Sequence, residues 1–180
     1  MKNFFNINEF VPVIFLALLY VRKTKPCKNI DLICHQAAVG SVPRSIEDPL
    51  TSHNSNVNSI LNLLIASKEN NVKRIVYASS SAVYGDEDTL PKIENKTGNP
   101  MSPYAVTKVV QELYCNLFTQ HYGVECIGLR YFNVFGPKQD PEGAYAAVIP
   151  KFIKLIKEGI SPTINGDGSY SRDFTYIDNV

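Results

Sequence analysis

The sequence predicts an α/β fold in which a mostly parallel sheet is flanked by helices. Three continuous apolar runs have the character of buried parallel strands, and segments with helical spacing of apolar residues follow them. Alternation of this kind is typical of βαβ units. The length of 180 residues and the 44% hydrophobic content are sufficient for one domain with its own core.

The first part of the pattern is a strand, a helix and a second strand. "IDLICHQAA", residues 30–38, is predicted to be a buried strand. A helix is predicted next, because apolar side chains recur three and four positions apart. These side chains are Val57, Ile60, Leu61, Leu64 and Ile65. "VKRIVYASSS", residues 72–81, is predicted to be the second buried strand.

The second part of the pattern begins with a helix that has clear end signals. Ser102 is suited to the N-cap, Pro103 to the first helical position, and Gly123 to the C-terminal stop. "VECIGLRYFNVFG", residues 124–136, is predicted to be the third strand, and residues 144–158 a further helix before a short tail.

The N-terminal segment does not fit this alternation. Residues 10–21 form an unbroken apolar run of twelve, whereas a membrane-spanning helix needs about 20. Basic residues follow the run where a signal peptide would carry its cleavage site. We therefore expect a buried or poorly ordered segment, with a membrane anchor as the alternative. Residues 1–28 are expected to be an atypical apolar segment, and 29–180 a partial domain.

Charge and cysteine content exclude several classes of function. The 18 Lys and Arg residues nearly balance the 17 Asp and Glu residues, so no nucleic-acid-binding surface is expected. The four cysteines show no C-x-x-C spacing, and the three histidines are scattered. We therefore expect no metal, and reduced thiols in a cytoplasmic protein.

Two hydroxyl-bearing patterns suggest the chemistry. Tyr104 and Lys108 lie four positions apart on one helix face, where an ammonium would lower a phenol pKa that starts near ~10. The serines of "SSSAVYG", which begin at Ser79, end the preceding strand. Together they suit proton transfer at an alcohol, with a nicotinamide as hydride acceptor. Alone, either pattern is more often structural, since Y-x-x-x-K is common and serines often make turns.

The motifs "HQAA", "SSSAVYG", "SPYAVTK", "LRYFNVFGP" and "RDFTYID" together resemble the extended short-chain dehydrogenase/reductases, the NAD-dependent nucleotide-sugar epimerase/dehydratase family. The resemblance covers residues 29–180. Within the family, the sequence is most similar to bacterial UDP-N-acetylglucosamine 4-epimerases of polysaccharide biosynthesis. It implies an incomplete Rossmann-like, doubly wound parallel sheet and an isomerase that transiently oxidises C4 of a UDP-sugar, UDP-N-acetylglucosamine or UDP-glucose.

The resemblance also implies roles for the matched residues. Tyr104 would be the acid/base, Lys108 would tune it and hold the nicotinamide ribose, and Ser80 with Ser81 would supply the catalytic hydroxyl. Besides Tyr104 and Lys108, the NAD site would include Ala37, Ala38, Asn56 and Phe132. The UDP-sugar would contact Gly40, Ser41, Asn133, Gln139, Ala147 and Arg172, with Arg172 opposing the diphosphate.

Two departures from the family pattern refine this interpretation. Ser81 and Ala82 stand where dehydratases of the family carry an Asp-Glu pair, so epimerisation is favoured over dehydration. The family's glycine-rich phosphate loop is missing, because Gly40 is the first glycine, and the chain stops at Val180, before the family's C-terminal lobe. We therefore expect the isolated chain to bind NAD weakly or not at all and to be catalytically silent.

Two interpretations of the whole chain remain open. It is either an epimerase polypeptide that requires the rest of the domain, or a catalytically silent remnant that interacts with a full-length epimerase. In both cases the family resemblance implies pairing, as a homodimer or with a homologue, through a four-helix interface. That interface would use the helix after Ser102 and the helix after Asn54.

Overall fold

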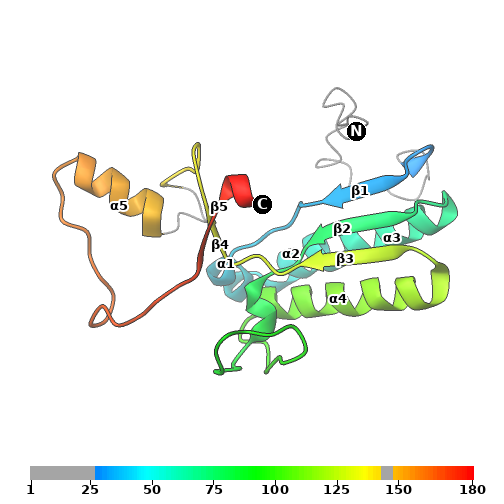
Figure 1. Ribbon diagram of the computed structural model, residues 1–180, viewed down its shortest axis with the longest axis horizontal. Coiled ribbons are helices and arrows are strands. Elements are labelled where there is room, and N and C mark those ends of the chain that lie inside the picture. The colour runs from blue at the N-terminus through cyan, green and yellow to red at the C-terminus, as the bar shows by residue number, and fades with distance from the viewer. Residues whose placement is uncertain (1–26, 143–147) are drawn as a thin grey trace.

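The computed structural model describes residues 27–142 and 148–180, and it contains two parallel sheets with helices beside them (Figure 1). The apolar run at residues 10–21 and the predicted substrate residue Ala147 lie outside the described residues. The larger sheet holds the core of the molecule, and the smaller sheet belongs to the C-terminal third of the chain.

The larger sheet confirms the predicted parallel arrangement. Its strands are β1 (Leu32–His35), β2 (Arg74–Ala78) and β3 (Glu125–Leu129), in the order β1-β2-β3, and all are parallel. The register places His35 beside Tyr77 and Tyr77 beside Gly128. All three carboxyl ends therefore lie at one edge, where ligands bind in sheets of this kind.

Helical segments connect the strands in the predicted order. Between β1 and β2 lie α1 (Val42–Glu47), α2 (Pro49–His53), the π-helix η4 (Asn54–Asn58) and α3 (Ser59–Glu69). After β2 come the 3₁₀-helix η5 (Ser81–Tyr84) and the long helix α4 (Pro103–Tyr122). The apolar spacing found in the sequence thus falls on η4 and α3.

The predicted ends of α4 are confirmed. The Ser102 side chain accepts a hydrogen bond from the backbone N–H of Ala105 at 3.1 Å, which satisfies one of the free donors of the first turn. Gly123 ends the helix with φ of +71°, a left-handed conformation that favours glycine. Helix α4 therefore starts and stops where the sequence predicted.

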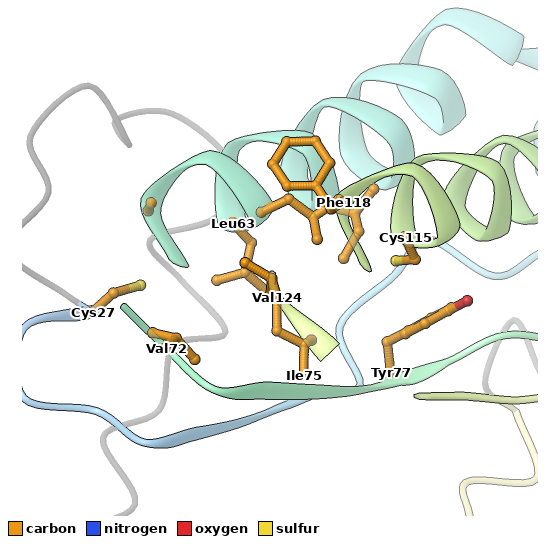
Figure 2. Packing of buried hydrophobic residues seen from close by; sticks show 11 residues of the cluster. Cys27, Leu63, Val72, Ile75, Tyr77, Cys115, Phe118 and Val124 are labelled. Carbon is orange, nitrogen blue, oxygen red and sulfur yellow. The ribbon is translucent and has the colours of Figure 1, made fainter. Parts of the chain in front are cut away.

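The hydrophobic core lies between the larger sheet and the two long helices (Figure 2). Ile60 and Leu64 of α3, Cys115 of α4 and Ile75 of β2 have no measurable exposure. Phe118 packs onto the same cluster from α4. Since burial of apolar surface is the main favourable contribution to folding, this layer holds the strand ends in place.

The sheet face away from α3 and α4 is much less covered. Leu32 is 57% exposed, Ile127 39% and Leu129 37%, and Cys34 is also exposed. The register places Cys34, Val76 and Ile127 in one row across this face. In residues 27–142 and 148–180, the two long helices therefore cover one face of the sheet, although both faces were expected to be buried.

The prediction of one strand over residues 124–136 is wrong. The chain leaves the larger sheet after Leu129 and forms β4 (Asn133–Phe135), which pairs in parallel with β5 (Phe174–Tyr176) in a second sheet. The side chain of Arg130 is drawn back to Glu112 of α4, and the Tyr131 N–H bonds to the Leu129 carbonyl at 3.0 Å. These contacts turn the backbone where the apolar pattern suggests continuity.

The C-terminal elements agree in part with the predictions. Helix α5 is described over Val148–Lys157, within the predicted 144–158, and Gly159 with φ of +71° follows it. The tail contains β5 and the 3₁₀-helix η6 (Ile177–Asn179), neither of which was predicted. The described part of the chain has no helix with the length and hydropathy that a membrane crossing demands.

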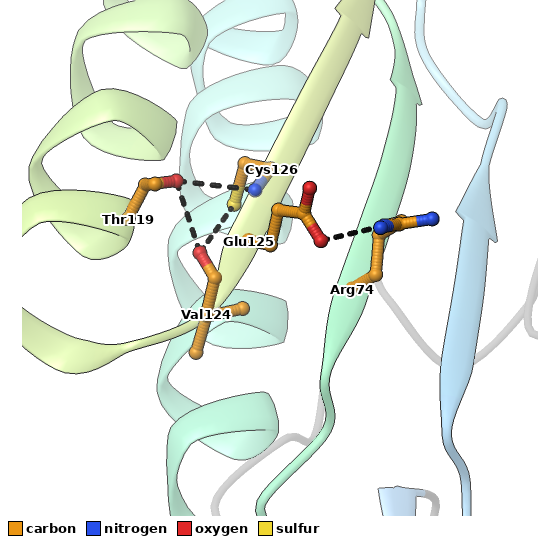
Figure 3. Close-up of polar contacts among 5 residues, drawn as sticks. All are labelled: Arg74, Thr119, Val124, Glu125 and Cys126. Atoms are coloured by element: carbon orange, nitrogen blue, oxygen red, sulfur yellow. Dashed lines mark hydrogen bonds and ion pairs between the residues drawn. The ribbon is translucent and has the colours of Figure 1, made fainter.

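Polar contacts attach β3 to its neighbours (Figure 3). The Thr119 hydroxyl donates to the Val124 carbonyl at 3.0 Å and accepts from the Cys126 N–H at 3.1 Å. On the other side, Arg74 pairs with Glu125 at 2.7 Å. Both residues of this pair are about half exposed, so we expect it to add little to stability.

We expect Leu64→Ala to lower the free energy of unfolding by about 2 to 5 kcal/mol, because it leaves a cavity in a fully buried position. Urea denaturation followed by circular dichroism measures this change. Ile65→Ala is the matched control, since Ile65 is the next residue of α3 and is 41% exposed. Equal losses in the two variants would contradict the core described above.

Candidate active site

The start of α4 and the end of β2 are joined by a buried lysine. Lys108 is 2% exposed, and its ammonium donates to the carbonyl of Ala78 at 2.7 Å and to Oε1 of Gln111 at 3.2 Å. Ala78 is the last residue of β2, directly before the serine run. The predicted Tyr/Lys pair and the predicted serines thus lie at the same edge of the sheet.

The backbone of Tyr104 is held in place from two sides. Its N–H donates to the hydroxyl of Ser45, a fully buried residue of α1, at 3.1 Å. Its carbonyl accepts from the Thr107 hydroxyl at 2.7 Å. The Lys108 ammonium lies 5.9 Å from the centre of the Tyr104 ring. The phenol is therefore partly exposed beside a buried cation.

The environment of Lys108 makes its charged form less favourable than it is in water. Burial lowers the pKa of Lys108 to about 8, and the nearby Glu112 carboxylate partly offsets this by raising it. With that value the side chain is still mostly protonated at neutral pH. A cation this poorly hydrated interacts strongly with groups beside it, because the local dielectric is low.

His35, at the end of β1, belongs to the same cluster. It is 7% exposed, and burial together with repulsion from Lys108 lowers its pKa to about 4. The imidazole is therefore neutral at neutral pH. Since its charged form is unfavourable in the folded state, His35 adds no second positive charge to the site.

The three serines after β2 have different contacts. The Ser79 hydroxyl, on a residue 4% exposed, donates to Oε1 of Glu112 at 2.5 Å. Ser80 is the N-cap of η5, and its hydroxyl accepts from the Ala82 N–H at 3.2 Å, which leaves its proton available for donation. The Ser81 backbone N–H bonds to the Tyr131 carbonyl at 2.9 Å. Ser79 is thus an anchor, whereas Ser80 retains a donor.

A partly buried ion pair lies next to Ser79. Two nitrogens of Arg130 bind the two carboxylate oxygens of Glu112, at 2.9 and 2.7 Å, and each side chain is 17% exposed. Arg130 also donates to the Glu94 carbonyl and stacks over the ring of Tyr84, 4.9 Å from its centre. This fork geometry is the strong form of an Arg–carboxylate contact.

The predicted NAD-lining residues lie near the sheet edge with different roles. Asn56 is 2% exposed; its Oδ1 accepts from the Val39 N–H at 2.8 Å, and its Nδ2 donates to the Val39 carbonyl and the Thr107 hydroxyl. It therefore clamps the loop after β1 to α4. Phe132 stacks on Tyr84 with ring centres 5.9 Å apart. Ala37 and Ala38 follow β1 in that loop.

The predicted substrate residues fall into two groups. Gly40 and Ser41 end the loop after β1, and the Ser41 hydroxyl caps α1 by accepting from the Arg44 N–H at 3.3 Å. Asn133 donates to the Asp173 carbonyl and ties β4 to the segment before β5. Among the described residues, Oε1 of Gln139 is buried without a partner, and Arg172 is exposed.

A cavity of about 650 Å³ lies beside this edge. Its lining includes Glu112, Arg130, Tyr131, Phe132 and Thr175, so it extends from α4 and the end of β3 to β5. The Tyr/Lys pair and Ser80 do not line it. We therefore place the candidate chemistry at the ends of β1 and β2, and regard the cavity as a neighbouring hollow.

The sequence interpretation missed several polar residues of this cluster. Thr107, Gln111 and Glu112 follow Tyr104 by three, seven and eight positions, so all lie on its helix face. Thr107 and Gln111 are almost fully buried. The detectable signal was a polar stripe where a packing face would be apolar. His35 and Arg130 carried no such local signal.

Comparisons with known proteins all indicate the same family. A model of the NAD dependent epimerase/dehydratase family matches residues 11–180. A putative UDP-glucose 4-epimerase of Methanocaldococcus jannaschii is 42% identical over 154 residues, which cover 85% of this chain and 50% of that protein. The UDP-glucose 4-epimerase of Mycolicibacterium smegmatis is 38% identical over 83% of this chain and 48% of its own length.

Solved structures agree with these matches. A UDP-N-acetylglucosamine 4-epimerase from Methanobrevibacter ruminantium, in complex with UDP-N-acetylmuramic acid, superposes with a TM-score of 0.82 at 49% identity, over 85% of this chain and 49% of that one. A UDP-glucuronic acid 4-epimerase from Bacillus cereus, with UDP-glucuronic acid and NAD, gives 0.77 at 34% identity, over 87% and 48%. This chain thus spans about half the length of the relatives it matches.

We expect His35 to make the protein less stable below neutral pH. Its folded pKa of about 4 lies below its ordinary value of 6.5, so the unfolded chain binds the proton more readily and stability falls as the pH drops through this window. The loss is about 2 kcal/mol by about pH 5. Urea denaturation at several pH values should show this extra slope in the wild type and not in His35→Gln.

His121→Gln is the matched control for that experiment. His121 lies near the end of α4 and is exposed, so its replacement should leave the pH dependence as in the wild type. If His35→Gln kept the full wild-type slope, the buried neutral imidazole would be refuted.

We expect Asn56→Ala to destabilise the fold in the absence of any ligand. The change leaves the partly buried N–H and carbonyl of Val39 without their partner, which costs about 1 to 3 kcal/mol. Thermal or urea denaturation measures it. Asn58→Ala, two positions later and exposed, is expected to change stability by under about 0.5 kcal/mol. Equal effects would show that Asn56 does not clamp the loop.

Proposed function

Because this chain belongs to the NAD dependent epimerase/dehydratase family, we propose that it carries the catalytic residues of an NAD-dependent UDP-sugar 4-epimerase. The observation that carries the proposal is the buried ammonium of Lys108, which joins the Tyr104 helix to the end of the serine-bearing strand. The names of the similar proteins, UDP-glucose and UDP-N-acetylglucosamine 4-epimerases among them, support the same substrate class.

The described residues fit one end of NAD. Two of the three Lys108 donors are used by Ala78 and Gln111, so in the described part of the chain one remains for a ribose hydroxyl. Ala37, Ala38 and Phe132 would contact the nicotinamide half. When bound, NAD supplies a reversible hydride acceptor for C4 of the sugar. The family's glycine-rich loop for the pyrophosphate, which precedes these motifs, is not found in the given sequence, where the first glycine is Gly40.

The proton at the sugar C4 hydroxyl would be handled by Tyr104 and Ser80. The ammonium of Lys108 favours the phenolate of Tyr104, which would accept the proton of the C4 hydroxyl during the oxidation. Ser80 still has its O–H to donate, since its contact to Ala82 uses the oxygen as acceptor. Tyr104 would give the proton back to the C4 oxygen when the keto sugar is reduced on its opposite face, which would complete the inversion.

The UDP-sugar would extend from this edge toward the smaller sheet. The exposed guanidinium of Arg172 is suited to the diphosphate, and the unpartnered Oε1 of Gln139 to a sugar or ribose hydroxyl. Gly40, Ser41, Asn133 and Ala147 are proposed to complete the contacts. UDP-N-acetylglucosamine is our first candidate and UDP-glucose the second, for a role in polysaccharide precursor synthesis.

The residues after Ser80 favour epimerisation over loss of water. Elimination needs an additional acid and base beside the reacting carbon, and Ser81 and Ala82 supply neither. We therefore propose that the keto sugar is reduced again without dehydration.

A homodimer through α3 and α4 is part of the proposal. Helix α4 exposes Val106, Leu113 and Leu117, at 44, 58 and 47%, and these positions recur at helical spacing. Ile65 of α3 is also exposed. Such a stripe on two helices is suited to burial against its own copy in a four-helix arrangement.

A second candidate function is a silent subunit that pairs with a full-length epimerase. It is favoured by the exposed apolar residues of α4, which would pack against a homologue as well as against a second copy of this chain. A complementary or longer homologue would then supply the cofactor platform. Co-purification of the tagged chain with a full-length homologue, compared between wild type and Leu113→Glu, tests the pairing.

We expect Tyr104→Phe to lower the epimerisation rate at least about 100-fold, because it removes the acid/base while retaining the ring. The assay follows interconversion of UDP-glucose with UDP-galactose, and of their N-acetyl counterparts, with added NAD. If activity requires the remainder of the domain, the assay uses the protein with its flanking coding sequence. The isolated 180-residue chain should bind NAD weakly in a calorimetric titration.

Tyr131→Phe is the matched control, since Tyr131 is a phenol near the same edge but lines the neighbouring cavity. If the Tyr104→Phe variant kept the wild-type turnover, the role of Tyr104 as the acid/base would be refuted. Tight NAD binding by the 180-residue chain would contradict the expected lack of a pyrophosphate site. Absence of turnover in every form, with co-purification of a homologue, would favour the silent subunit.

A further inference from the structure

We propose that Glu112 is a positioning residue: its carboxylate holds the end of β2 and the turn after β3 against α4, and its negative charge, one helical turn from Lys108, favours the ammonium beside Tyr104. The importance of this for catalysis rests on the proposed function, since it assumes that Tyr104 is the acid/base. The structural and electrostatic parts of the inference stand on the contacts of Glu112 itself.

The Glu112 carboxylate connects three segments that are distant in the sequence. It accepts from the hydroxyl of Ser79 at the end of β2 and from two nitrogens of Arg130 after β3. It extends from α4 one turn after Lys108, whose own ammonium reaches Ala78. Helix α4 is therefore joined to two consecutive residues at the end of β2, one by a cation and the other by an anion.

These contacts set the geometry of the reacting groups. Ser80 follows Ser79 directly, and Tyr104 lies two turns before Glu112 on the same helix. Any sliding or rotation of α4 relative to β2 would break the Glu112 contact and change the separation of the phenol from the Ser80 hydroxyl. A misplacement of about 1 Å in such groups can cost about 100-fold in rate.

The charge of Glu112 has a second effect. Lys108 and Arg130 are both cations in a partly dehydrated layer, and Glu112 is the carboxylate that acts on both. Burial alone raises the pKa of Glu112, but the bonds from Arg130 and Ser79 and the charges of Arg130 and Lys108 outweigh it, so the carboxylate stays ionised. His35, at the end of β1, is neutral at neutral pH and therefore adds no charge to this layer.

A purely structural ion pair and a positioning residue make different predictions. If the pair only adds stability, its removal changes the free energy of unfolding and leaves the titration of Lys108 unchanged. If Glu112 holds the ammonium charged, its removal also lowers the pH at which Lys108 loses its proton. The titration midpoint of Lys108 is therefore the decisive measurement.

The experiment follows the Lys108 side chain by NMR in the 180-residue protein labelled with ¹³C-lysine, the signal being assigned by its absence in Lys108→Arg. In the wild type we expect a midpoint near the depressed value of about 8. In Glu112→Gln we expect a midpoint lower by about 0.5 pH units or more, because a charge–charge stabilisation is lost. Far-UV circular dichroism establishes that the variant is folded.

For a second variant we expect the Lys108 midpoint to shift in the opposite direction. Arg130→Gln removes the cation that shares Glu112, while the carboxylate remains ionised near pH 8 because its ordinary pKa is ~4.3. The Lys108 midpoint should then rise. Glu125→Gln is the matched control, because it removes a carboxylate bound to Arg74 at the opposite end of the sheet, and it should leave the midpoint unchanged (Figure 3).

An unchanged Lys108 midpoint in folded Glu112→Gln, or a fall in Arg130→Gln, overturns the inference. Loss of the fold in both variants also overturns it, since the pair would then be structural. The measurement needs neither NAD nor sugar nucleotide, so its failure leaves the epimerase proposal intact. Conversely, absence of turnover in the Tyr104 experiment would leave the electrostatic role of Glu112 standing.

Discussion

The hydrogen bond from the Lys108 ammonium to the carbonyl of Ala78 is the constraint on which the candidate active site depends. It brings a helix and a strand end together by placing a cation in a layer that offers it little water. A buried charge is tolerated only where hydrogen bonds and a counter-charge surround it. Gln111, on the inner face of α4, accepts a hydrogen bond from the ammonium. Glu112, which Arg130 holds in place, supplies the counter-charge. The placement of Tyr104 follows from the same set of contacts.

The elements with local signals could be predicted from the sequence. Helix α4 begins at Ser102 and ends at Gly123 because capping and a left-handed glycine act within a few residues, and their chemistry is visible in the sequence. The strands β1 and β2 were also found, since both lie in continuous apolar runs, although one face of their sheet is sparsely covered. The Tyr/Lys pair could be predicted as well, because two residues that are four positions apart on a helix lie on the same side of it.

What could not be predicted depends on contacts between distant segments. At the break between β3 and β4, Arg130 bonds back to Glu112, a partner on another element that the apolar pattern does not reveal. The different contacts of Ser79 and Ser80 could not be predicted either. The Ser79 hydroxyl donates to Glu112 on α4, whereas the Ser80 hydroxyl accepts from a backbone N–H. The side-chain amide of Asn56 is of a type that often binds ligands, yet in the structure both of its N–H donors are used by Val39 and Thr107. A pattern can name the residue type at a site, but tertiary packing decides whether that residue is an anchor or retains a hydrogen-bonding group for a ligand.

The sparsely covered face of the larger sheet has a consequence for how the protein exists in the cell. Leu32, Cys34 and Ile127 form an apolar surface that the long helices of the described residues do not shield. Surfaces of this kind drive self-association when they meet at high concentration.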